Sequence, residues 1–370
     1  VPIVPTEPRL DLELDDELIQ IPDNWKNLKR LKDLRLGYSD FEKFSEVIGQ
    51  LSSLGSFSYD SGIYIDDKAI ATLAKLPLLK KLAFTKMVPP GDLPIDSEKE
   101  YSFIFPESLG QLECLEELDL STNVEMSALP ESIKYLKNLK KLTLSNDDSD
   151  VWTIQLDSIP TTIGELTNLE ELKLFGLVNL SLLPESIINL NKLRVLDIRE
   201  TDIQHINLTH YQLTRLEWLG VNYPFAPLTQ CHSLKELNYL LGDAFLFRGK
   251  FYKTSAKKPF DRKDLEPLTN LSSLEKLYIH GGILTGTHFL TELTHLEELG
   301  LSSNFSFLPA NIDKLQKLRR LNIWGATALT SLPETLALIP ALKYIRCASC
   351  GIKEPPAWLK DRPDIKFEIE

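Results

Sequence analysis

The chain of 370 residues is 43% hydrophobic and 25% charged, and its 41 Lys and Arg against 53 Asp and Glu give a net charge of −12. This charge argues against a nucleic-acid or anionic-membrane binder, because both kinds of partner require a basic surface. No apolar run reaches the roughly 18 residues of a membrane span, and the first residues lack a signal-peptide pattern. Its 4 cysteines are too few for a disulfide scaffold.

A short pattern, Leu-x-x-Leu-x-Leu or a close variant, recurs along the chain. Its clear copies end at Leu120, Leu144, Leu174, Ile198, Val221, Ile279, Leu301, Ile323 and Cys347, and weaker copies lie at 31–36, 54–59, 79–84 and 234–239. Leu118 and Leu142 are 24 residues apart, as are Leu172 and Leu196. Apolar residues alternate within each copy, which predicts one short strand per copy.

A second pattern lies between the predicted strands and begins with an apolar residue followed by proline. It occurs at 21–28, 105–112, 129–136, 159–166, 183–190, 308–315 and 332–339, for example LPESIKYL at 129–136. Apolar residues stand before the proline and again three and six residues after it, which is helical spacing with one buried stripe. Proline suits the first helical position. We therefore expect a short helix or 3-10 turn in each repeat, with proline as its first residue.

A short strand that alternates with a short helical turn at this period resembles the leucine-rich-repeat (LRR) family, and the LPxxΦxxL segments resemble its bacterial and intracellular members. The best-matching runs are LEELDLSTN (115–123) and LTHLEELGLSSN (293–304). The resemblance implies an α/β fold: a solenoid or horseshoe with a parallel β-sheet on its concave face and short helices or 3-10 turns on its convex face. We expect a single LRR domain, 1–370, with about 13–14 repeats. Its N-terminal cap is expected at about 1–20 and its C-terminal cap at about 351–370.

Changes of spacing mark insertions near 86–104, 146–157 and 241–263. The register is least regular between 221 and 271, where we assign the strands by Leu219, Leu237 and Leu277.

In this family an Asn follows the strand, and its buried side chain satisfies backbone groups of the turn. We expect Asn123 and Asn304 in that slot. Other repeats carry Asp147, Leu177, Thr201, Gly282, Ala326 or Cys350 there, which interrupts the Asn ladder.

The sequence holds no recognisable catalytic or cofactor motif: GxGxxG, GxxxxGK[ST], HExxH and GxSxG are all absent. His205 and His210 are five residues apart, which does not place them on one helical face. Cys347 and Cys350 form a CxxC pair, but the repeat places both in core-facing slots, which favours packing over zinc or redox chemistry. The acidic run at 146–157 lacks the glycine and the final glutamate of a calcium loop. We therefore expect no catalytic residues, no metal site and no cofactor.

The main candidate site follows from the alternation of side chains along the predicted strands. Residues that flank the inward apolar positions point away from the core, onto the concave face. In the C-terminal half this face gathers aromatic and basic residues: Trp218, Tyr278, His280, Arg320, Trp324, Tyr344 and Arg346. The small residues Gly300 and Ser302 lie between Tyr278 and Trp324 and predict a notch. Exposed aromatic residues and Arg carry much of the binding energy at protein interfaces. The alternative is that these rings cover one another or are covered by the insertion at 241–263.

The insertion at 241–263 is the second candidate for a partner contact. It carries seven Lys and Arg against two Asp, with Phe and Tyr residues between them. Its candidate contact residues are Arg248, Lys250, Phe251, Tyr252, Lys257 and Lys258. A basic, aromatic loop suits an acidic partner, whereas the alternative is an ordinary surface loop.

The sequence thus predicts a non-catalytic scaffold that binds a protein or peptide through the concave face of an LRR solenoid. A rigid sheet displays side chains in fixed positions, so little conformational entropy is lost on binding. The alternative is the recognition or substrate-targeting arm of a larger effector, receptor or signalling enzyme whose catalytic domain lies outside this chain. We expect a monomer with no nucleic-acid partner and no membrane span. The lack of cysteine-paired caps favours the cytoplasm, with a secreted bacterial protein as the other choice.

Overall fold

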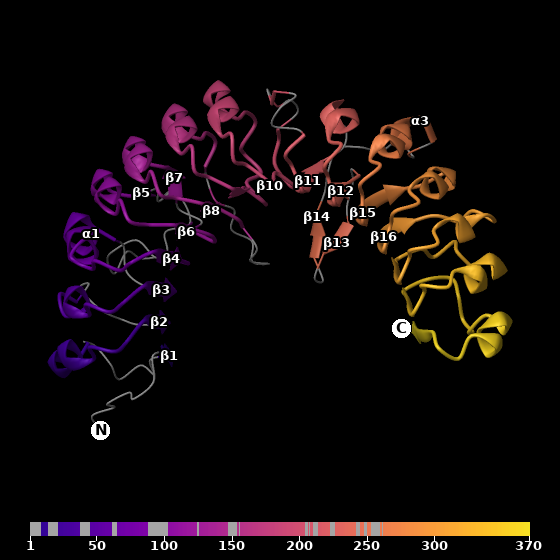
Figure 1. Ribbon diagram of the computed structural model, residues 1–370, viewed down its shortest axis with the longest axis horizontal. Helices are drawn as coiled ribbons and strands as arrows, with labels where there is room; N and C mark the ends of the chain where they lie inside the picture. Colours follow the sequence, from indigo (N-terminus) through magenta and orange to yellow (C-terminus); the bar gives the residue numbers. More distant parts are fainter. Residues whose placement is uncertain are drawn as a thin grey trace, which may run out of the picture. The chain divides into compact units, whose positions relative to one another are not determined.

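The computed structural model describes residues 9–13, 21–37, 45–60, 65–87, 103–123, 126–146, 154, 156–203, 206, 208–209, 214–222, 226–241, 245–247, 250–252, 260 and 262–370. The chain forms two compact units: unit 1 comprises Val1–Leu193 and Glu200–Leu208, and unit 2 comprises Arg194–Arg199 and Thr209–Glu370. In each unit the strands lie along one side and the short helical turns along the other (Figure 1). The predicted alternation of strand and turn is therefore confirmed.

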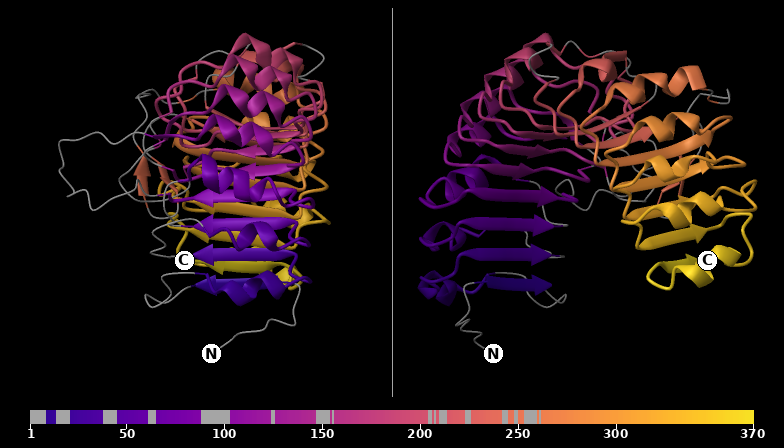
Figure 2. Two further views of the ribbon diagram at one scale, coloured as in Figure 1. Left: turned by 90° about the vertical axis from the view of Figure 1, so that its left-hand side faces the viewer. Right: turned by 45° about the vertical axis from the view of Figure 1, so that its right-hand side comes forward.

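The sheet of unit 1 is built from parallel strands that follow one another in chain order. They are β1 (Arg9–Glu13), β2 (Asp33–Gly37), β3 (Ser56–Asp60), β4 (Lys81–Thr85), β6 (Glu117–Asp119), β8 (Lys141–Thr143) and β9 (Glu171–Lys173). A separate two-stranded parallel sheet joins β5 (Phe103–Ile104) to β7 (Met126–Ala128). The strands of unit 1 lie one above another and point the same way (Figure 2). Most of the insertions at 86–104 and 146–157 lies outside the described residues.

The sheet of unit 2 continues the same design. Its strands are β10 (Val195–Asp197), β11 (Trp218–Asn222), β12 (Glu236–Leu240), β15 (Lys276–Ile283), β16 (Glu298–Asn304), β17 (Arg320–Trp324), β18 (Tyr344–Ala348) and β19 (Lys366–Ile369). Leu219 pairs with Leu237, and Leu237 pairs with Leu277. The register assigned to the irregular stretch is therefore confirmed. The insertion between β12 and β15 contains an antiparallel hairpin of β13 (Phe245–Phe247) and β14 (Lys250–Tyr252).

The proline-led segments form the turns opposite the strands. The 3-10 helices are η1 (Asp23–Asn27), η2 (Ile48–Gln50), η3 (Glu107–Gln111), η4 (Glu131–Tyr135), η5 (Thr161–Glu165), η6 (Glu185–Asn189), η7 (Ala226–Gln230), η8 (Glu266–Asn270), η9 (His288–Glu292), η10 (Ile312–Lys314), η11 (Glu334–Leu338) and η12 (Ala357–Asp361). Among the described residues, two segments are α-helical, α1 (Asp67–Leu73) and α3 (Arg262–Leu265). The side chain of Asp66 caps α1 by accepting a hydrogen bond from the amide of Ala69 at 2.8 Å.

The prolines stand one position earlier than predicted. Pro130 precedes η4 with an extended backbone, φ −69° and ψ 145°, and is therefore the residue before the helix rather than its first residue. Pro106 and Pro184 do the same before η3 and η6. The carbonyl of Pro130 still accepts the first turn's hydrogen bond from the amide of Ile133 at 3.2 Å. A fixed φ near −65° is compatible with both positions, so the sequence pattern alone did not separate them.

The core of each unit is a stack of inward leucines. Leu142 and Leu172 in unit 1, and Leu219, Leu277 and Leu299 in unit 2, are 0% exposed. One repeat cannot bury such a stripe alone, whereas neighbouring repeats bury it against each other. The stacking of repeats therefore accounts for the stability of both units.

The Asn slot is filled as predicted at residue 123. The buried side-chain amide of Asn123 donates hydrogen bonds to the carbonyls of Phe84 at 2.7 Å and Leu120 at 2.8 Å, and its oxygen accepts one from the amide of Met87 at 2.9 Å. One side chain thus satisfies three buried backbone groups and ties two repeats together.

The same prediction is wrong for Asn304. Strand β16 continues to residue 304, so the alternation of side chains places Ser303 inward and Asn304 outward. Ser303 is 3% exposed and donates a hydrogen bond to the carbonyl of Gly281 at 2.6 Å. Asn304 is half-buried, and its side-chain Oδ1 accepts a 3.4 Å hydrogen bond from the amide of Ala328. Because β16 extends to residue 304, the buried polar side chain of this repeat is Ser303 rather than Asn304.

Candidate functional site

The seven residues predicted for the concave face all lie on the exposed face of the unit 2 sheet. Trp218 belongs to β11, Tyr278 and His280 to β15, Arg320 and Trp324 to β17, and Tyr344 and Arg346 to β18. All are half-buried except Arg320, which is exposed. We call this set of seven residues the aromatic face. The strand pairing places Tyr278 opposite Gly300, and Arg320 opposite Tyr344.

Tyr278 is fixed by the strand that follows it. Its hydroxyl donates a hydrogen bond to Oε2 of Glu298 at 2.9 Å. Its ring lies over Gly300, where an added Cβ would stand 2.5 Å from Cδ1 of the ring. Burial and the Glu298 carboxylate together raise the pKa of Tyr278 well above its ordinary value. The ring therefore occupies part of the predicted notch, and its donor is already used within the protein.

Trp218 is held in the same way, with an added cation. Its indole Nε1 donates a hydrogen bond to Oε1 of Glu236 on the next strand at 2.8 Å. The guanidinium of Arg199 lies 5.5 Å from the centre of the ring, within the range of a cation–π contact. Arg199 is itself bound to Asp197 by Nε at 2.9 Å and Nη2 at 2.7 Å.

Gly220 makes room for this arrangement. A Cβ at Gly220 would lie 2.5 Å from Oδ1 of Asp197 and 2.9 Å from Cη2 of Trp218. The side chains of Arg199 and Asp197 are only 17% and 6% exposed, so their ion pair is largely shielded from water. Partly buried charges are tolerated when they are paired and hydrogen-bonded, because the pairing offsets the cost of removing them from water.

Tyr344 repeats the arrangement near the C-terminal end of the sheet. The guanidinium of Arg320 lies 5.9 Å from its ring centre, and the ammonium of Lys366 lies 5.8 Å away. Its hydroxyl donates a hydrogen bond to Oε2 of Glu368 on the next strand. Trp218 and Tyr344 therefore both have a cation from the preceding repeat against the ring and a carboxylate from the following strand at the polar atom.

The supporting residues were not predicted from the sequence. Asp197, Arg199, Glu236, Glu298 and Glu368 set the positions of the rings, yet none was among the candidates. A signal was present for one of the rings, because Trp218 has its acid, Glu236, at the paired position of the next strand. Tyr278 and Tyr344 pair instead with Gly300 and Lys366, and their acids Glu298 and Glu368 stand two positions away along those strands. Reading each outward position across successive repeats would therefore have found Glu236 alone.

His280 lies within β15, and Trp324 is the last residue of β17. Burial lowers the pKa of His280 to about 4, and the positive charge of Arg199 adds to this effect. His280 is therefore neutral at neutral pH. Trp324 is half-buried, and no acceptor for its indole N–H lies among the described residues. Trp324 thus offers a donor to an external group, which Trp218 does not.

The two arginines of the aromatic face, Arg346 and Arg320, differ in whether a carboxylate of the protein pairs with them. Nη2 of Arg346 forms an ion pair with Oε2 of Glu370, which raises the pKa of the guanidinium. Arg320 has no carboxylate within ion-pair distance among the residues described by the structure. Arg320 is therefore the cation of the aromatic face that remains available to an acidic group of a partner.

The insertion is described only in part. Lys250, Phe251 and Tyr252 lie on β14, paired with β13, and only their backbone is described. Arg248, Lys257 and Lys258 lie outside the described residues. Strand β13 lies against β15, the strand that carries Tyr278 and His280. The two candidate sites of the sequence are therefore neighbours in unit 2.

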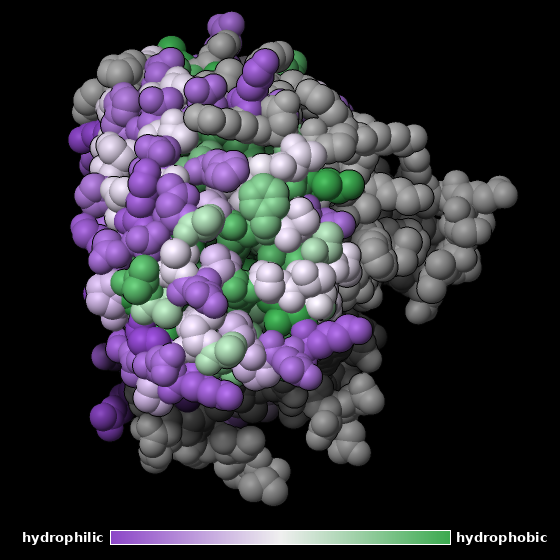
Figure 3. All heavy atoms as spheres, turned by 90° about the vertical axis from the view of Figure 1, so that its right-hand side faces the viewer, coloured by the Kyte–Doolittle hydropathy of each residue, from purple (hydrophilic) through white to green (hydrophobic). Residues whose placement is uncertain are grey.

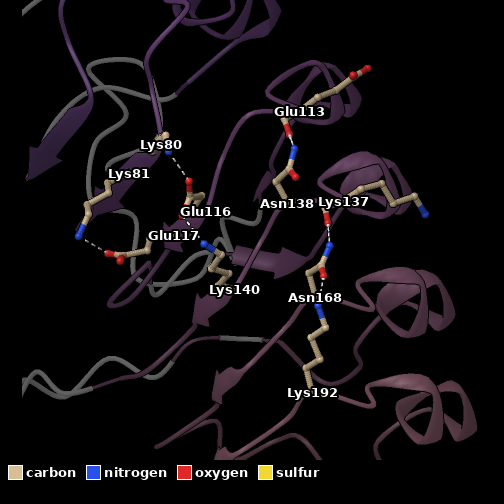
Figure 4. A network of polar contacts seen from close by, with 10 residues as sticks. All are labelled: Lys80, Lys81, Glu113, Glu116, Glu117, Lys137, Asn138, Lys140, Asn168 and Lys192. Atoms are coloured by element: carbon tan, nitrogen blue, oxygen red, sulfur yellow. Dashed lines mark hydrogen bonds and ion pairs between the residues drawn. The ribbon is translucent and has the colours of Figure 1, made fainter.

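The corresponding face of unit 1 has a different character. Its outward positions pair Lys81 with Glu117 at 3.0 Å and Lys141 with Glu171 at 2.9 Å. Beside them, Glu116 binds both Lys80 and Lys140 at 2.6 Å, which lowers its pKa to about 2 (Figure 4). Asn138 and Asn168 donate hydrogen bonds to carbonyls of the preceding repeat, at 2.9 Å to Glu113 and 2.7 Å to Lys137 (Figure 4). These contacts join one repeat to the next and leave few unused groups.

A further exposed surface is apolar. On the side shown in Figure 3, apolar side chains gather near the middle, with hydrophilic ones to their left and below them. Among the described residues of unit 2, the exposed large apolar side chains are Ile283, Phe307, Leu338 and Ile369. Scattered apolar side chains are ordinary on protein surfaces. The aromatic face, with its repeated pairing of rings and charges, is therefore the stronger candidate site.

Metal-binding clusters and membrane spans are both absent from the described part of the chain. No group of three or more His, Cys, Asp and Glu side chains there is placed to hold a metal ion. No helix among the same residues has the length and apolar character needed to cross a membrane. Among the described residues, the aromatic face presents ring faces, one guanidinium without a carboxylate in ion-pair distance and one indole donor without an acceptor.

The repeat motif, the parallel sheet and the 3-10 turns together make up the fold of a leucine-rich-repeat solenoid. No family model matches the chain. In sequence it is 28% identical over 193 residues to the volume-regulated anion channel subunit LRRC8B of Homo sapiens, covering 49% of this chain and 23% of that protein. It is 27% identical over 349 residues to the TMV resistance protein N of Nicotiana glutinosa, covering 90% of this chain and 25% of that protein. The chain thus spans about a quarter of these curated relatives.

Solved structures agree on the fold. An LRR protein of Leptospira interrogans has a TM-score of 0.52 at 23% identity, with 95% of this chain and 93% of that one covered. An internalin of Listeria monocytogenes has a TM-score of 0.50 at 17% identity, with 93% and 81% covered. At such low identity the likeness shows the solenoid fold alone. The fold predicted from the repeats is confirmed.

Proposed function

We propose that this chain is a non-catalytic scaffold that binds a protein or peptide through the aromatic face, on the side of the sheet that is concave in this family. One observation carries the proposal. The rings of Trp218, Tyr278 and Tyr344 are each anchored by a carboxylate on the following strand. Rings that are already fixed lose little conformational entropy when a partner covers them.

The chemistry of the face suits a polypeptide partner. Aromatic rings and Arg are the side chains that dominate binding energy at protein interfaces. The N–H and O–H groups of the anchored rings already have partners within the protein, so the ring surface that Arg199, Arg320 and Lys366 leave uncovered is suited to apolar side chains. Arg320 and the indole N–H of Trp324 then supply a positive charge and a donor, which suit a carboxylate and a backbone carbonyl. A segment with an acidic residue near an apolar one matches this set.

A displayed library of random peptides tests the proposal even though the natural partner is unidentified. We expect selection against the wild-type chain to enrich a family of related peptides. The double variant Trp324→Ala and Tyr278→Ala should lose binding of these peptides by at least about tenfold, because two half-buried rings are removed. Lys81→Ala with Lys141→Ala on unit 1 is the matched control and should bind as the wild type does. Equal binding by all three proteins would overturn the site assignment.

A second proposal concerns the larger protein. Since the chain spans only about a quarter of its curated relatives, it is also suited to be the recognition arm of a longer effector, receptor or signalling enzyme. The reading frame of the source gene tests this directly. A further folded segment encoded in the same frame supports this second proposal, and a frame that encodes the repeats alone contradicts it.

A further inference from the structure

A basic segment of unit 1 runs from η1 to the start of β2. Its inward positions are Trp25, Leu28 and Leu31, which are buried in the core. Because these three residues hold the segment against the core, the residues between them face the solvent. Four of those residues are basic and exposed: Lys26, Lys29, Arg30 and Lys32. We call these four residues the basic flank.

Lys29 has a close counterpart in a later repeat, where the segment KYLKNLK at 134–140 matches its own segment. The counterpart is Lys137, whose ammonium donates to Oε2 of Glu165, the last residue of η5, at 2.9 Å. Lys29 reaches the last residue of η2 in the same way, but that residue is Gln50. The contact is a 3.2 Å hydrogen bond to the backbone carbonyl of Gln50. A carboxylate therefore balances the charge of Lys137, whereas an uncharged residue stands beside Lys29.

Lys32 differs from its counterpart, Lys140, for a similar reason. Glu116 binds the ammonium groups of both Lys80 and Lys140 at 2.6 Å (Figure 4). The corresponding residue between Lys32 and Lys80 is Gly55, whose amide donates a hydrogen bond to the carbonyl of Lys32 at 2.9 Å. Glycine has no side chain, so Lys32 meets no carboxylate at this position.

The basic flank thus carries positive charge that the protein does not neutralise. Among the described residues, no carboxylate lies within ion-pair distance of any of its four side chains. Its segment contains no acid, and the nearest acids in the sequence, Asp23 and Asp33, stand outside it. Elsewhere a cation at the position of Lys32 is paired, as Lys343 is with Asp364 at 2.6 Å. The lack of acids, rather than an excess of lysine, therefore creates this positive surface.

We propose that the basic flank binds an acidic segment of a partner protein, independently of the aromatic face. Carboxylates of the partner take the roles beside Lys29 and Lys32 that Glu165 and Glu116 have in the later repeat. Complementary charge directs encounter and fixes the orientation of the partner. A short polypeptide segment fits a flank of this size. A nucleic acid or an anionic membrane is less suited, because it extends beyond the flank over a protein whose net charge is −12.

A fluorescein-labelled hexaglutamate peptide tests the proposal by fluorescence anisotropy. At about 0.1 M ionic strength, screening limits the attraction to charges within about 10 Å. We expect the wild-type chain to bind this peptide and not a hexaglutamine peptide. The double variant Lys29→Gln and Lys32→Gln should weaken binding at least about fivefold, because two unpaired charges are lost.

The matched control is Lys137→Gln with Lys140→Gln. It changes the same repeat positions and the same net charge, but its lysines are already paired within the protein. We expect it to alter binding by less than about twofold. Circular dichroism checks that both variants are folded. Equal losses in the two variants, or no binding of hexaglutamate by the wild type, overturn the proposal.

Gln50→Glu tests the structural cause with a single exposed substitution. The new carboxylate should pair with Lys29 as Glu165 pairs with Lys137, and should weaken peptide binding by about threefold. Unchanged binding by Gln50→Glu overturns the proposal. An oligothymidylate and phosphatidylserine vesicles are measured alongside the peptide. Binding of either one that is lost in the Lys29→Gln and Lys32→Gln variant, without binding of hexaglutamate, also overturns it.

Discussion

The hydroxyl of Tyr278 donates a hydrogen bond to Oε2 of Glu298 at 2.9 Å, while the ring of Tyr278 lies over Gly300. Glu298 and Gly300 both belong to β16, so one strand fixes the polar atom and the ring of the same side chain. The geometry depends on the absence of a side chain at residue 300.

The substitution Gly300→Ala is expected to displace the ring. Its Cβ would stand 2.5 Å from Cδ1 of Tyr278, so the ring must move and its hydrogen bond to Glu298 must lengthen. We expect the free energy of unfolding to fall by about 1–3 kcal/mol, measured by urea denaturation. Gly286→Ala is the control, because nothing lies within 4 Å of a Cβ at that position. A Gly300→Ala protein as stable as the control would contradict this account.

Asn123→Ala is expected to destabilise unit 1. The change removes three hydrogen bonds and leaves the amide of Met87 and the carbonyls of Phe84 and Leu120 buried without that partner. Buried groups left unsatisfied predict a loss of about 2–4 kcal/mol in thermal or urea unfolding. Asn304→Ala should change stability by less than about 0.5 kcal/mol, since Asn304 stands outside the slot. Similar losses for the two variants would refute the distinction between the two asparagines.

Thr122→Gly is expected to stabilise the protein. Thr122 has a φ of 59°, a left-handed conformation that is costly for a β-branched residue. The equivalent position in other repeats is Gly176 or Gly325, with φ of 77° and 72°. After the higher unfolded-state entropy of glycine is counted, we expect a gain of about 0.5–1 kcal/mol. Gly325→Thr is the reverse control, because a Cβ there meets nothing within 4 Å, and it should lower stability through the backbone alone.

His280 is expected to make stability depend on pH. Its pKa is lowered from 6.5 to about 4 in the folded protein, so the unfolded chain binds more protons between these values. The contribution of neutral His280 is complete above pH 6.5 and is lost as the pH falls towards about 4. We expect the difference in unfolding free energy between the wild type and His280→Gln to shrink across this window. A difference that stays constant from pH 7 to pH 4 would rule out a buried, neutral His280.

Much of the fold was predictable because it repeats. The alternation of Leu118 and Leu120 around Asp119 specifies a strand in any copy, and copies at a regular period bury their leucines against one another. The register held even where the spacing was irregular, at Leu219, Leu237 and Leu277. The predicted domain boundaries and the concave-face contacts stay predictions.

The errors came from positions whose environment depends on neighbouring strands. The slot of Asn304 could not be read from its motif, because the length of β16 decides which of Ser303 and Asn304 points inward. Cys350 was expected to be buried but is half-buried, since it stands in the turn beyond β18.

The sequence by itself determined the repeat, the inward leucines and the outward positions of the aromatic residues, because these follow from local periodicity. Only the tertiary structure decided which charge meets which ring. Arg199 is 19 positions before Trp218 in the sequence but stacks on its indole, and Glu298 anchors Tyr278 across two paired strands. Such contacts depend on strand register and on the space left by Gly220 and Gly300, and both arise only when the repeats stack.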